Sequence, residues 1–305
     1  MKNAEYIARK FPSPLRYPGG KSGLSKFLSK VLETNGINGN YCEGYAGGAG
    51  AALNLLLKDK IERVILNDAD IHIYSFWSSI LKDADRFIER LINCPITISE
   101  WNIQKSIYEN PLKNSEFDVG FSTFFLNRTN RGGILPKAGP TGGLSQDGHY
   151  KINARFKKEN LIPRIEKIFT LRNRISFYNY DAVEFLDMIQ SDFDISNTLI
   201  YLDPPYYEQG KNLYLNYYYD RDHSELSSKL KKSFTDNWLV SYDNVAHIRQ
   251  LYPKHRYCAF DINYSVQTTR KGKEIMFFSH NLKLPLKLEI GSQSYNLNLD
   301  LCPTK

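Results

Sequence analysis

The feature that most constrains this chain is the order of elements that residues 40–68 predict. Asn40–Glu43 has the pattern of a short strand and runs directly into the glycine-rich turn Tyr45–Gly50. Ala51–Leu57 is a strongly helical apolar run, and Arg63–Leu66 has the pattern of a second, buried strand. Strand, glycine-rich turn, helix and strand form one half of a doubly wound sheet. The sequence therefore predicts an α/β fold.

The same stretch predicts a site for an adenosine-containing cofactor. Glycines such as Gly47 and Gly48 let the backbone turn tightly and come close to a ligand. Asp68 follows the second strand, roughly 20 residues after the glycines, where a carboxylate can accept hydrogen bonds from ribose hydroxyls. This pair suits any adenosine cofactor, a nicotinamide dinucleotide included. A tight turn followed by a helix-capping aspartate is the purely structural alternative.

The pattern changes after the second strand. Helical segments alternate with charged breaks over residues 71–126, and residues 128–155 are rich in Gly, Asn, Arg and Lys without a hydrophobic period. A loop of that length in a compact domain is usually functional or disordered. Strand and helix patterns then resume. We expect a catalytic domain of residues 1–71 and 172–305 and a helical insert of residues 72–171 that carries a loop or β-hairpin.

The tetrapeptide Asp203-Pro204-Pro205-Tyr206 follows the strand pattern of residues 198–202. Two prolines fix the backbone and remove two N–H donors. The rigid turn that remains presents the Asp203 carboxylate and the Pro204 carbonyl, which can hold an amino group and stabilise positive charge on it. Tyr206 offers a flat face on which a base can stack. A dehydrogenase has no use for this turn. The turn therefore argues against a dehydrogenase, which the glycines alone do not.

A third motif, RYPGGK at residues 16–21, is a glycine loop between an aromatic ring and a cation. On its own it fits a turn that leads into a helix as well as it fits a ligand site. The formal net charge of +7 and the pI of about 9.0 favour a polyanionic partner, with nucleic acid first. Hydrophobic residues make up 42% of the chain, enough for a packed core.

The cysteines and the absence of long apolar runs bear on the compartment. The four cysteines are scattered, without a CxxC pair or a nearby histidine cluster, so we expect free thiols and no metal site. We see no signal peptide and no apolar run of about 18 residues, and therefore expect a cytoplasmic protein. The cysteines are Cys42, Cys94, Cys258 and Cys302.

Together these motifs resemble the Dam-type, D12 class N6-adenine-specific DNA methyltransferases, over nearly the whole chain from Leu15 to Ser279. The shared order is a glycine–lysine loop, an FxGxG-like turn, an acid, a recognition insert and DPPY. Further matches are Phe125-Leu-Asn127-Arg128, Asn179-Tyr-Asp181, Ser241-Tyr-Asp-Asn244 and residues 263–274. The resemblance implies a Rossmann-like sheet that binds S-adenosylmethionine, and methyl transfer to the N6 amine of adenine in duplex DNA.

The resemblance also implies roles for individual residues. One wall of the cofactor site would come from the glycine–lysine loop, the middle from the turn after the first strand, the ribose contact from Asp68 and the adenine contact from Asp181. Ala49 stands where the family has a glycine, and alanine fits there if its φ is negative; Tyr45 stands where Phe is usual. The implied cofactor residues are Tyr17, Gly20, Lys21, Glu43, Tyr45, Gly47, Gly48, Asp68 and Asp181.

The implied mechanism begins with flipping of the adenine out of the duplex, because its amine cannot otherwise reach the methyl donor. Tyr206 would stack on the base, and Asp203 and the Pro204 carbonyl would accept the amine hydrogens during direct in-line transfer. The insert would read the DNA, with Arg131 and Ile134 the candidates to enter the groove. The DNA-contacting residues that we expect are Arg128, Arg131, Ile134, Lys137 and Arg155.

Several alternatives remain open. A methyltransferase acting on the cytosine N4 amine uses the same turn, although it more often has Ser than Asp in the tetrapeptide. An RNA methyltransferase or a catalytically inactive DNA-binding homologue is also conceivable. A carbon-5 cytosine enzyme needs a nucleophilic cysteine after a proline, which this chain lacks. The sequence leaves open the recognition site and any cognate restriction or defence component, and we expect a monomer.

Overall fold

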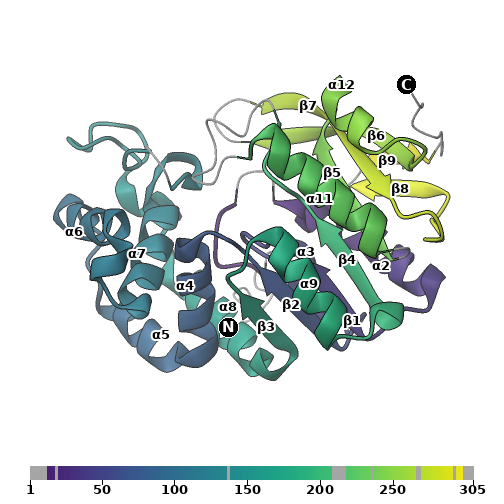
Figure 1. The fold of residues 1–305 in the computed structure, drawn as a ribbon. Helices are drawn as coiled ribbons and strands as arrows, with labels where there is room; N and C mark the ends of the chain where they lie inside the picture. Colours follow the sequence, from purple (N-terminus) through teal and green to yellow (C-terminus); the bar gives the residue numbers. More distant parts are fainter. Residues whose placement is uncertain are drawn as a thin grey trace. The chain divides into compact units, whose positions relative to one another are not determined.

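The computed structural model describes residues 12–17, 20–135, 138–207, 218–234, 237–265, 269–290 and 293–297. Its strands are β1 (Asn40–Glu43), β2 (Arg63–Asn67), β3 (Ile175–Tyr178), β4 (Thr198–Leu202), β5 (Trp238–Asp243), β6 (Arg256–Ser265), β7 (Thr269–Phe278), β8 (Lys287–Ile290) and β9 (Gln293–Asn296). Seven of the described strands form one sheet of order β3-β2-β1-β4-β5-β7-β6, and β8 pairs with β9 (Figure 1). β1 is parallel to β2 and β4, and β4 to β5, whereas β7 is antiparallel to β5 and β6. This mostly parallel sheet confirms the predicted Rossmann-like α/β fold.

The chain divides into two compact units. The helical unit comprises Met1–Gly19 and Asp70–Asn179, and the sheet unit comprises Gly20–Ala69 and Tyr180–Lys305. The predicted assignment of catalysis to one part of the chain and DNA recognition to residues 72–171 concerns function, and it stays a prediction.

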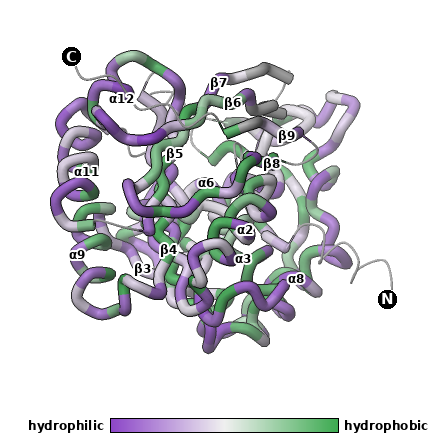
Figure 2. The backbone as a smooth tube through the Cα atoms, turned by 90° about the vertical axis from the view of Figure 1, so that its right-hand side faces the viewer, coloured by the Kyte–Doolittle hydropathy of each residue, from purple (hydrophilic) through white to green (hydrophobic). Residues whose placement is uncertain are grey.

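The sheet unit has a strongly apolar centre. Its helices are η1 (Lys21–Leu24), α2 (Ser25–Asn35), α3 (Gly50–Leu57), α9 (Ala182–Asp192), η6 (Ile195–Asn197), α11 (Asp220–Ser233) and α12 (Ala246–Leu251). Every residue of β4 and β5 is buried, as is typical of strands in the middle of a sheet covered on both faces. α11 is mostly hydrophilic, as expected of a surface helix, whereas the strands β4 and β5 themselves are largely hydrophobic (Figure 2).

The helical unit is built around aromatic side chains. Its elements are α4 (Ile71–Lys82), α5 (Ala84–Asn93), α6 (Ile98–Glu109), η2 (Pro111–Lys113), α7 (Glu116–Thr129), η3 (Arg131–Gly133), η4 (Ile152–Arg155), α8 (Lys158–Thr170) and η5 (Arg172–Arg174), with β3 at its end. Phe76, Phe87 and Phe124 meet with ring centroids 5.4–5.9 Å apart. α7 approaches α4 so closely that a Cβ on Gly120 would lie 2.3 Å from the Ser75 carbonyl. This glycine therefore sets the contact between the two helices.

The cysteines agree with the expected chemistry where they are described. Cys42, Cys94 and Cys258 are buried free thiols, and Cys302 lies outside the described residues. Burial raises the pKa of the Cys258 thiol to about 11, which makes it unreactive near neutral pH. Among the described helices, none is long and apolar enough to cross a membrane.

The turn after β1 does not meet the condition under which alanine was expected to fit there without strain, a negative φ. Ala49 adopts the left-handed conformation, with φ 49° and ψ 32°. Gly47 also has a positive φ, of 46°, whereas the φ of Gly48 is not positive. Ala49 sits at the N-cap of α3, its N–H donating to the Ala46 carbonyl at 2.6 Å and its own carbonyl accepting from Leu53 at 3.0 Å. The turn thus requires the left-handed region at the position where the family has glycine, and the alanine is strained there.

We expect Ala49→Gly to raise the free energy of unfolding by up to about 1 kcal/mol. Relief of a left-handed alanine, roughly 1–2 kcal/mol, exceeds the extra chain entropy that glycine gives the unfolded state, about 0.4–1 kcal/mol. The control is Ala51→Gly in α3, expected to lower that free energy by about 1 kcal/mol. Urea unfolding measures both, and an Ala49→Gly protein less stable than wild type would contradict the strained turn.

Candidate active site

The candidate site lies where parallel strands of the sheet unit end. In this fold class, ligands bind outside the carboxyl ends of the strands. β1 ends at Glu43, β2 is followed by Asp68, and β4 leads directly into Asp203. Because β1 lies between β2 and β4 in the sheet, these three strand ends are neighbours. The fold therefore brings the acidic residues predicted from the sequence to one edge.

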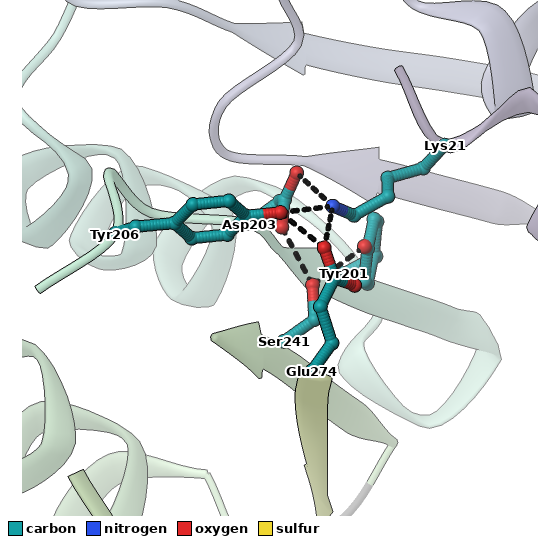
Figure 3. Close-up of polar contacts among 6 residues, drawn as sticks. All are labelled: Lys21, Tyr201, Asp203, Tyr206, Ser241 and Glu274. Atoms are coloured by element: carbon teal, nitrogen blue, oxygen red, sulfur yellow. Dashed lines mark hydrogen bonds and ion pairs between the residues drawn. The ribbon is translucent and has the colours of Figure 1, made fainter. Parts of the chain in front are cut away.

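Lys21 is the electrostatic centre of this edge (Figure 3). Its side chain is 5% exposed, and its ammonium donates to the Tyr206 hydroxyl and to Glu274 Oε1, both at 3.0 Å. The same Nζ lies 3.2 Å from Asp203 Oδ2. The Tyr206 hydroxyl donates to Glu274 as well. One buried cation therefore joins the start of η1, the turn after β4 and strand β7.

Asp203 is held at both carboxylate oxygens. Ser241 donates to Oδ1 at 2.6 Å, and the Ser241 hydroxyl lies 2.7 Å from that of Tyr201. Burial raises the pKa of Asp203, Lys21 lowers it, and the Glu274 carboxylate raises it further, so that it lies above its ordinary value. Burial lowers the pKa of Lys21, but Asp203 and Glu274 outweigh this and hold it well above the ordinary value. The site thus combines a permanent ammonium with a carboxylate of increased proton affinity.

A like-charge pair in the sheet explains why a cation is needed here. Glu274 on β7 stands directly opposite Asp243 on β5, and the two residues are 0% and 8% exposed. Like charges directly opposite across a sheet are destabilising. Lys21 compensates Glu274, while Asp243 Oδ1 accepts the N–H of Tyr207 at 2.9 Å. The residue that follows the DPPY turn is therefore fixed to β5.

Three of the four residues of the DPPY turn are buried. Pro204 and Pro205 are buried, Tyr206 is 4% exposed, and the Asp203 side chain is 20% exposed. The Tyr206 hydroxyl is engaged by Lys21 and Glu274, and Lys21 Nζ lies 5.4 Å from the centroid of the Tyr206 ring. A base can stack on this ring only after its face is uncovered.

Glu43 is a buried carboxyl at the end of β1. Its Oε1 accepts hydrogen bonds from the Tyr41 hydroxyl and the Ala52 N–H, both at 3.1 Å. Burial raises the pKa of Glu43 to about 8, although these two hydrogen bonds lower it. Ala52 lies in the first turn of α3, where backbone N–H groups lack partners within the helix. Glu43 therefore also helps to start the helix that follows the glycine turn.

The glycine turn is tied to the end of β2 by a buried amide. Gly47 donates its N–H to Asp68 Oδ2 at 2.9 Å. Asn67, at 0% exposed, donates to the carbonyls of Gly44 at 3.1 Å and Tyr180 at 3.0 Å, and accepts the Tyr180 N–H at 2.9 Å. The turn after β1, the acid after β2 and the chain that leads into α9 are thereby held together.

The other predicted cofactor residues have varied surroundings. The Tyr45 hydroxyl donates to that of Tyr218 at 2.8 Å, and the two rings meet edge-on. Asp181 is exposed and caps α9 by accepting the Val183 N–H at 2.9 Å. Gly48 is buried in the turn after β1, Gly20 is exposed directly before η1, and Tyr17 is half-buried in the helical unit. Their contacts with a cofactor remain predictions.

The predicted DNA-contacting residues that are described all lie in the helical unit. Arg128 is half-buried in the last turn of α7, and its Nε donates to the Arg155 carbonyl at 3.0 Å. Arg131 is exposed in η3, and Ile134 is half-buried directly after it. Lys137 lies outside the described residues. The exposed guanidiniums of Arg131 and Arg155 are placed so that a ligand can reach them.

The loop after α7 is ordered by its own polar side chains. Within the described residues it is closed by a single antiparallel bridge, Asn130 to Pro140. Of the two expected forms, a loop or a β-hairpin, the described residues form a loop. Trp101 Nε1 donates to Asn130 Oδ1 at 2.7 Å. Gln146 donates to the Thr141 carbonyl at 2.9 Å and accepts the Ile152 N–H at 2.8 Å. The side-chain amide of Gln146 is thus occupied within the loop.

Four residues of the site were missed by the sequence reasoning: Tyr201, Ser241, Glu274 and Asn67. Glu274 carried a signal, because it is a single acid between the basic run 270–273 and the apolar stretch that follows. Ser241 similarly interrupts an apolar strand. A polar residue inside a buried strand needs a partner, since burial without one is costly. That rule marks such positions but does not say which partner they have.

A family model now bears on these observations. The model described as D12 class N6 adenine-specific DNA methyltransferase matches residues 17–270 of the chain. No curated protein sequence matches the chain.

Among solved structures, the chain is similar to an rRNA methyltransferase from Streptomyces viridochromogenes, with 11% identity, 86% of each chain covered and a TM-score of 0.37. It is also similar to an O-methyltransferase from Bacillus cereus, with 12% identity, 84% of this chain and 80% of that chain covered and a TM-score of 0.32. A putative methyltransferase from Escherichia coli matches with 10% identity, 85% and 87% covered and a TM-score of 0.31.

Proposed function

This chain belongs to the D12 class N6 adenine-specific DNA methyltransferase family, and we propose that it takes its methyl group from S-adenosylmethionine and transfers it to a flipped adenine at a specific site in duplex DNA. As a member of this family it is an adenine-specific DNA methyltransferase. The observation that carries the proposal is the Asp203 turn, a rigid pair of acceptors with a half-buried carboxylate fixed by Lys21 and Ser241.

The residues at the strand ends suit S-adenosylmethionine because their carboxylates can accept hydrogen bonds from its hydroxyl and amino groups. Asp68 is half-buried beside the Gly47 turn, where a carboxylate can accept hydrogen bonds from ribose hydroxyls. Asp181 is exposed at the start of α9, and one of its oxygens caps the helix while the carboxylate can accept from an adenine amine. When bound, the cofactor supplies an electrophilic methyl group.

The flipped adenine would present its amine to Asp203 and to the Pro204 carbonyl. Each oxygen of a carboxylate has two acceptor positions, so Asp203 can accept an amine hydrogen while it keeps its bonds from Ser241 and Lys21. Because those two partners fix the carboxylate, little reorganisation is needed as positive charge develops on the nitrogen. Tyr206 would stack on the base, for which the ring has to be uncovered.

The raised pKa of Asp203 suits the last step. Once N6 has gained a methyl group it carries a positive charge and must lose one proton, and Asp203 is the nearest proposed acceptor of that proton. Burial and Glu274 raise the pKa of Asp203, which favours proton uptake, while Lys21 lowers it and so favours the ionised form. Lys21 itself stays protonated because of the two carboxylates beside it. We therefore assign Lys21 to positioning and Asp203 to contact with the substrate.

DNA recognition would fall to the helical unit. Arg131 and Arg155 are exposed, and arginine recognises both guanine edges and phosphates. We propose that Arg131 and Ile134 lie at the groove and that Arg128 and Arg155 serve the DNA backbone. We also propose a monomer, since one active site and one recognition unit suffice.

We expect Asp203→Asn to lower methyl transfer by at least about 100-fold, because asparagine neither carries the charge nor takes up the proton. Binding of S-adenosylmethionine, followed by calorimetry, should stay within a few-fold of wild type. Asp192→Asn, at an exposed position of α9, is the matched control and should keep full activity. Transfer from labelled S-adenosylmethionine to plasmid DNA measures all three proteins.

The methylated nucleoside separates the candidate functions. N6-methyl-2′-deoxyadenosine released from the product DNA supports the proposal, whereas N4-methyl-2′-deoxycytidine would show that the cytosine amine is the substrate instead. Normal turnover by Asp203→Asn would overturn the assignment of Asp203. Binding of cofactor and DNA without any transfer by the wild-type protein would point to the inactive homologue.

A further inference from the structure

Four arginines of the helical unit come together, and none of them forms a salt bridge with a carboxylate of the described residues. They are Arg16 in the N-terminal segment, Arg128 at the end of α7, Arg155 in η4 and Arg164 in α8. Arg128 Nε donates to the Arg155 carbonyl at 3.0 Å, and Arg164 Nη1 donates to the Ser13 carbonyl at 2.9 Å. We call these four residues the arginine cluster.

A buried asparagine builds the cluster. Asn127, at 1% exposed, accepts the Arg16 N–H at 2.7 Å and donates to the Arg16 carbonyl at 2.8 Å. It also donates to the Gly133 carbonyl at 2.9 Å. Because Arg128 is the next residue along α7, this clamp places Arg16 beside it. The Asn127-Arg128 pair of the sequence motif thus fixes the N-terminal segment with one side chain and contributes a cation with the other.

The cluster holds positive charge that the residues described in the structure do not compensate. In the described part of the chain, no salt bridge joins any of the four arginines to a carboxylate. Arg16 Nη1 and Arg164 Nε are buried and have no hydrogen-bond partner there. Burial, and then Arg16, Arg164 and Arg155, lower the pKa of Arg128 to about 9. Burial and Arg155 lower the pKa of Arg16 in the same way.

Such a group is unfavourable unless an anion completes it. Buried arginines are normally paired, and unsatisfied guanidinium donors cost free energy. A phosphate offers several acceptor oxygens in the spacing that planar guanidinium groups bind best. Arg155 is exposed, whereas Arg16, Arg128 and Arg164 are half-buried, so a ligand can enter from the Arg155 side.

We propose that Arg16, Arg128, Arg155 and Arg164 form a binding site for one backbone phosphate of the DNA substrate. The assignment to DNA rests on the proposed function, because a backbone phosphate and free phosphate present the same tetrahedral anion to the arginines. A backbone phosphate carries no sequence information, so the site would orient the duplex while other residues read the bases.

The first experiment uses inorganic phosphate and needs no DNA. The full-length wild-type protein is melted in phosphate and in chloride at equal ionic strength and pH. We expect phosphate to raise its Tm by about 2 °C or more, because a ligand that binds the folded state stabilises it. The variant is Arg164→Gln, and the control is Arg172→Gln, which makes the same charge change at an exposed position of the same unit.

Two results distinguish a ligand site from a structural arginine. Arg164→Gln should lose most of the phosphate shift and, in chloride, should melt no lower than wild type, because like-charge repulsion is relieved. Arg172→Gln should keep the full shift. A phosphate shift that is the same in all three proteins, or a lower Tm of Arg164→Gln in chloride with the shift retained, would overturn the site.

The second experiment assigns the ligand to DNA. Anisotropy of a labelled duplex, measured over a range of salt concentrations, gives the slope of log K against log[salt]. We expect the double variant Arg16→Gln/Arg164→Gln to reduce the magnitude of this slope by about 1, equally for unrelated sequences, as loss of one phosphate contact does. Arg172→Gln should leave the slope unchanged.

The two experiments fail independently. A phosphate-dependent Tm shift with an unchanged salt slope would overturn DNA as the source of the anion. Absence of any DNA binding by wild type would overturn the proposed function, and the Tm experiment would still decide whether the cluster binds phosphate.

Discussion

The arrangement of the catalytic edge depends on one buried ammonium. Lys21 comes from the start of η1, Asp203 from the turn after β4 and Glu274 from β7, and they meet within 3.2 Å of a single nitrogen. Without the cation, the half-buried Asp203 and the buried Glu274 would lose their shared partner, and Asp243 stands opposite Glu274 across the sheet. Removing one partner of such a group is strongly destabilising because it leaves uncompensated buried charge. Lys21 therefore fixes the DPPY turn and opposes the rise in the pKa of its aspartate.

Part of this site could be predicted from the sequence, and the reason is local. The strand before the glycines, Asp68 after the second strand and the DPPY turn are all set by chain order, and parallel strands bring their ends to one edge. Glu274, Ser241 and Asn67 could not be assigned, because their partners follow from the antiparallel register of β7 and from contacts far apart along the chain. Ala49 fits the turn without strain only at a negative φ, but at the N-cap of α3 it is left-handed. Sequence spacing marked the position but could not supply its backbone angle.

The helical unit shows a similar division between folding and ligand binding. The aromatic side chains pack against one another and Asn127 has hydrogen-bond partners. In the arginine cluster, two buried guanidinium nitrogens lack hydrogen-bond partners among the described residues. Folded proteins commonly accept unfavourable groups where a ligand will complete them, at some cost in stability. Both units therefore place charged side chains where the substrate is proposed to bind. In the sheet unit, Lys21 compensates the carboxylates, and in the helical unit a phosphate of the DNA would compensate the arginine cluster.

The central claim is that the chain methylates the N6 amine of adenine at a specific DNA sequence. The most direct measurement is to express it in a host that lacks adenine methylation and to sequence the genomic DNA by a modification-sensitive single-molecule method. The account predicts N6-methyladenine at nearly every copy of one short motif and at few other adenines. Methylated cytosine amines, or unmodified DNA in cells that contain the folded protein, would contradict it.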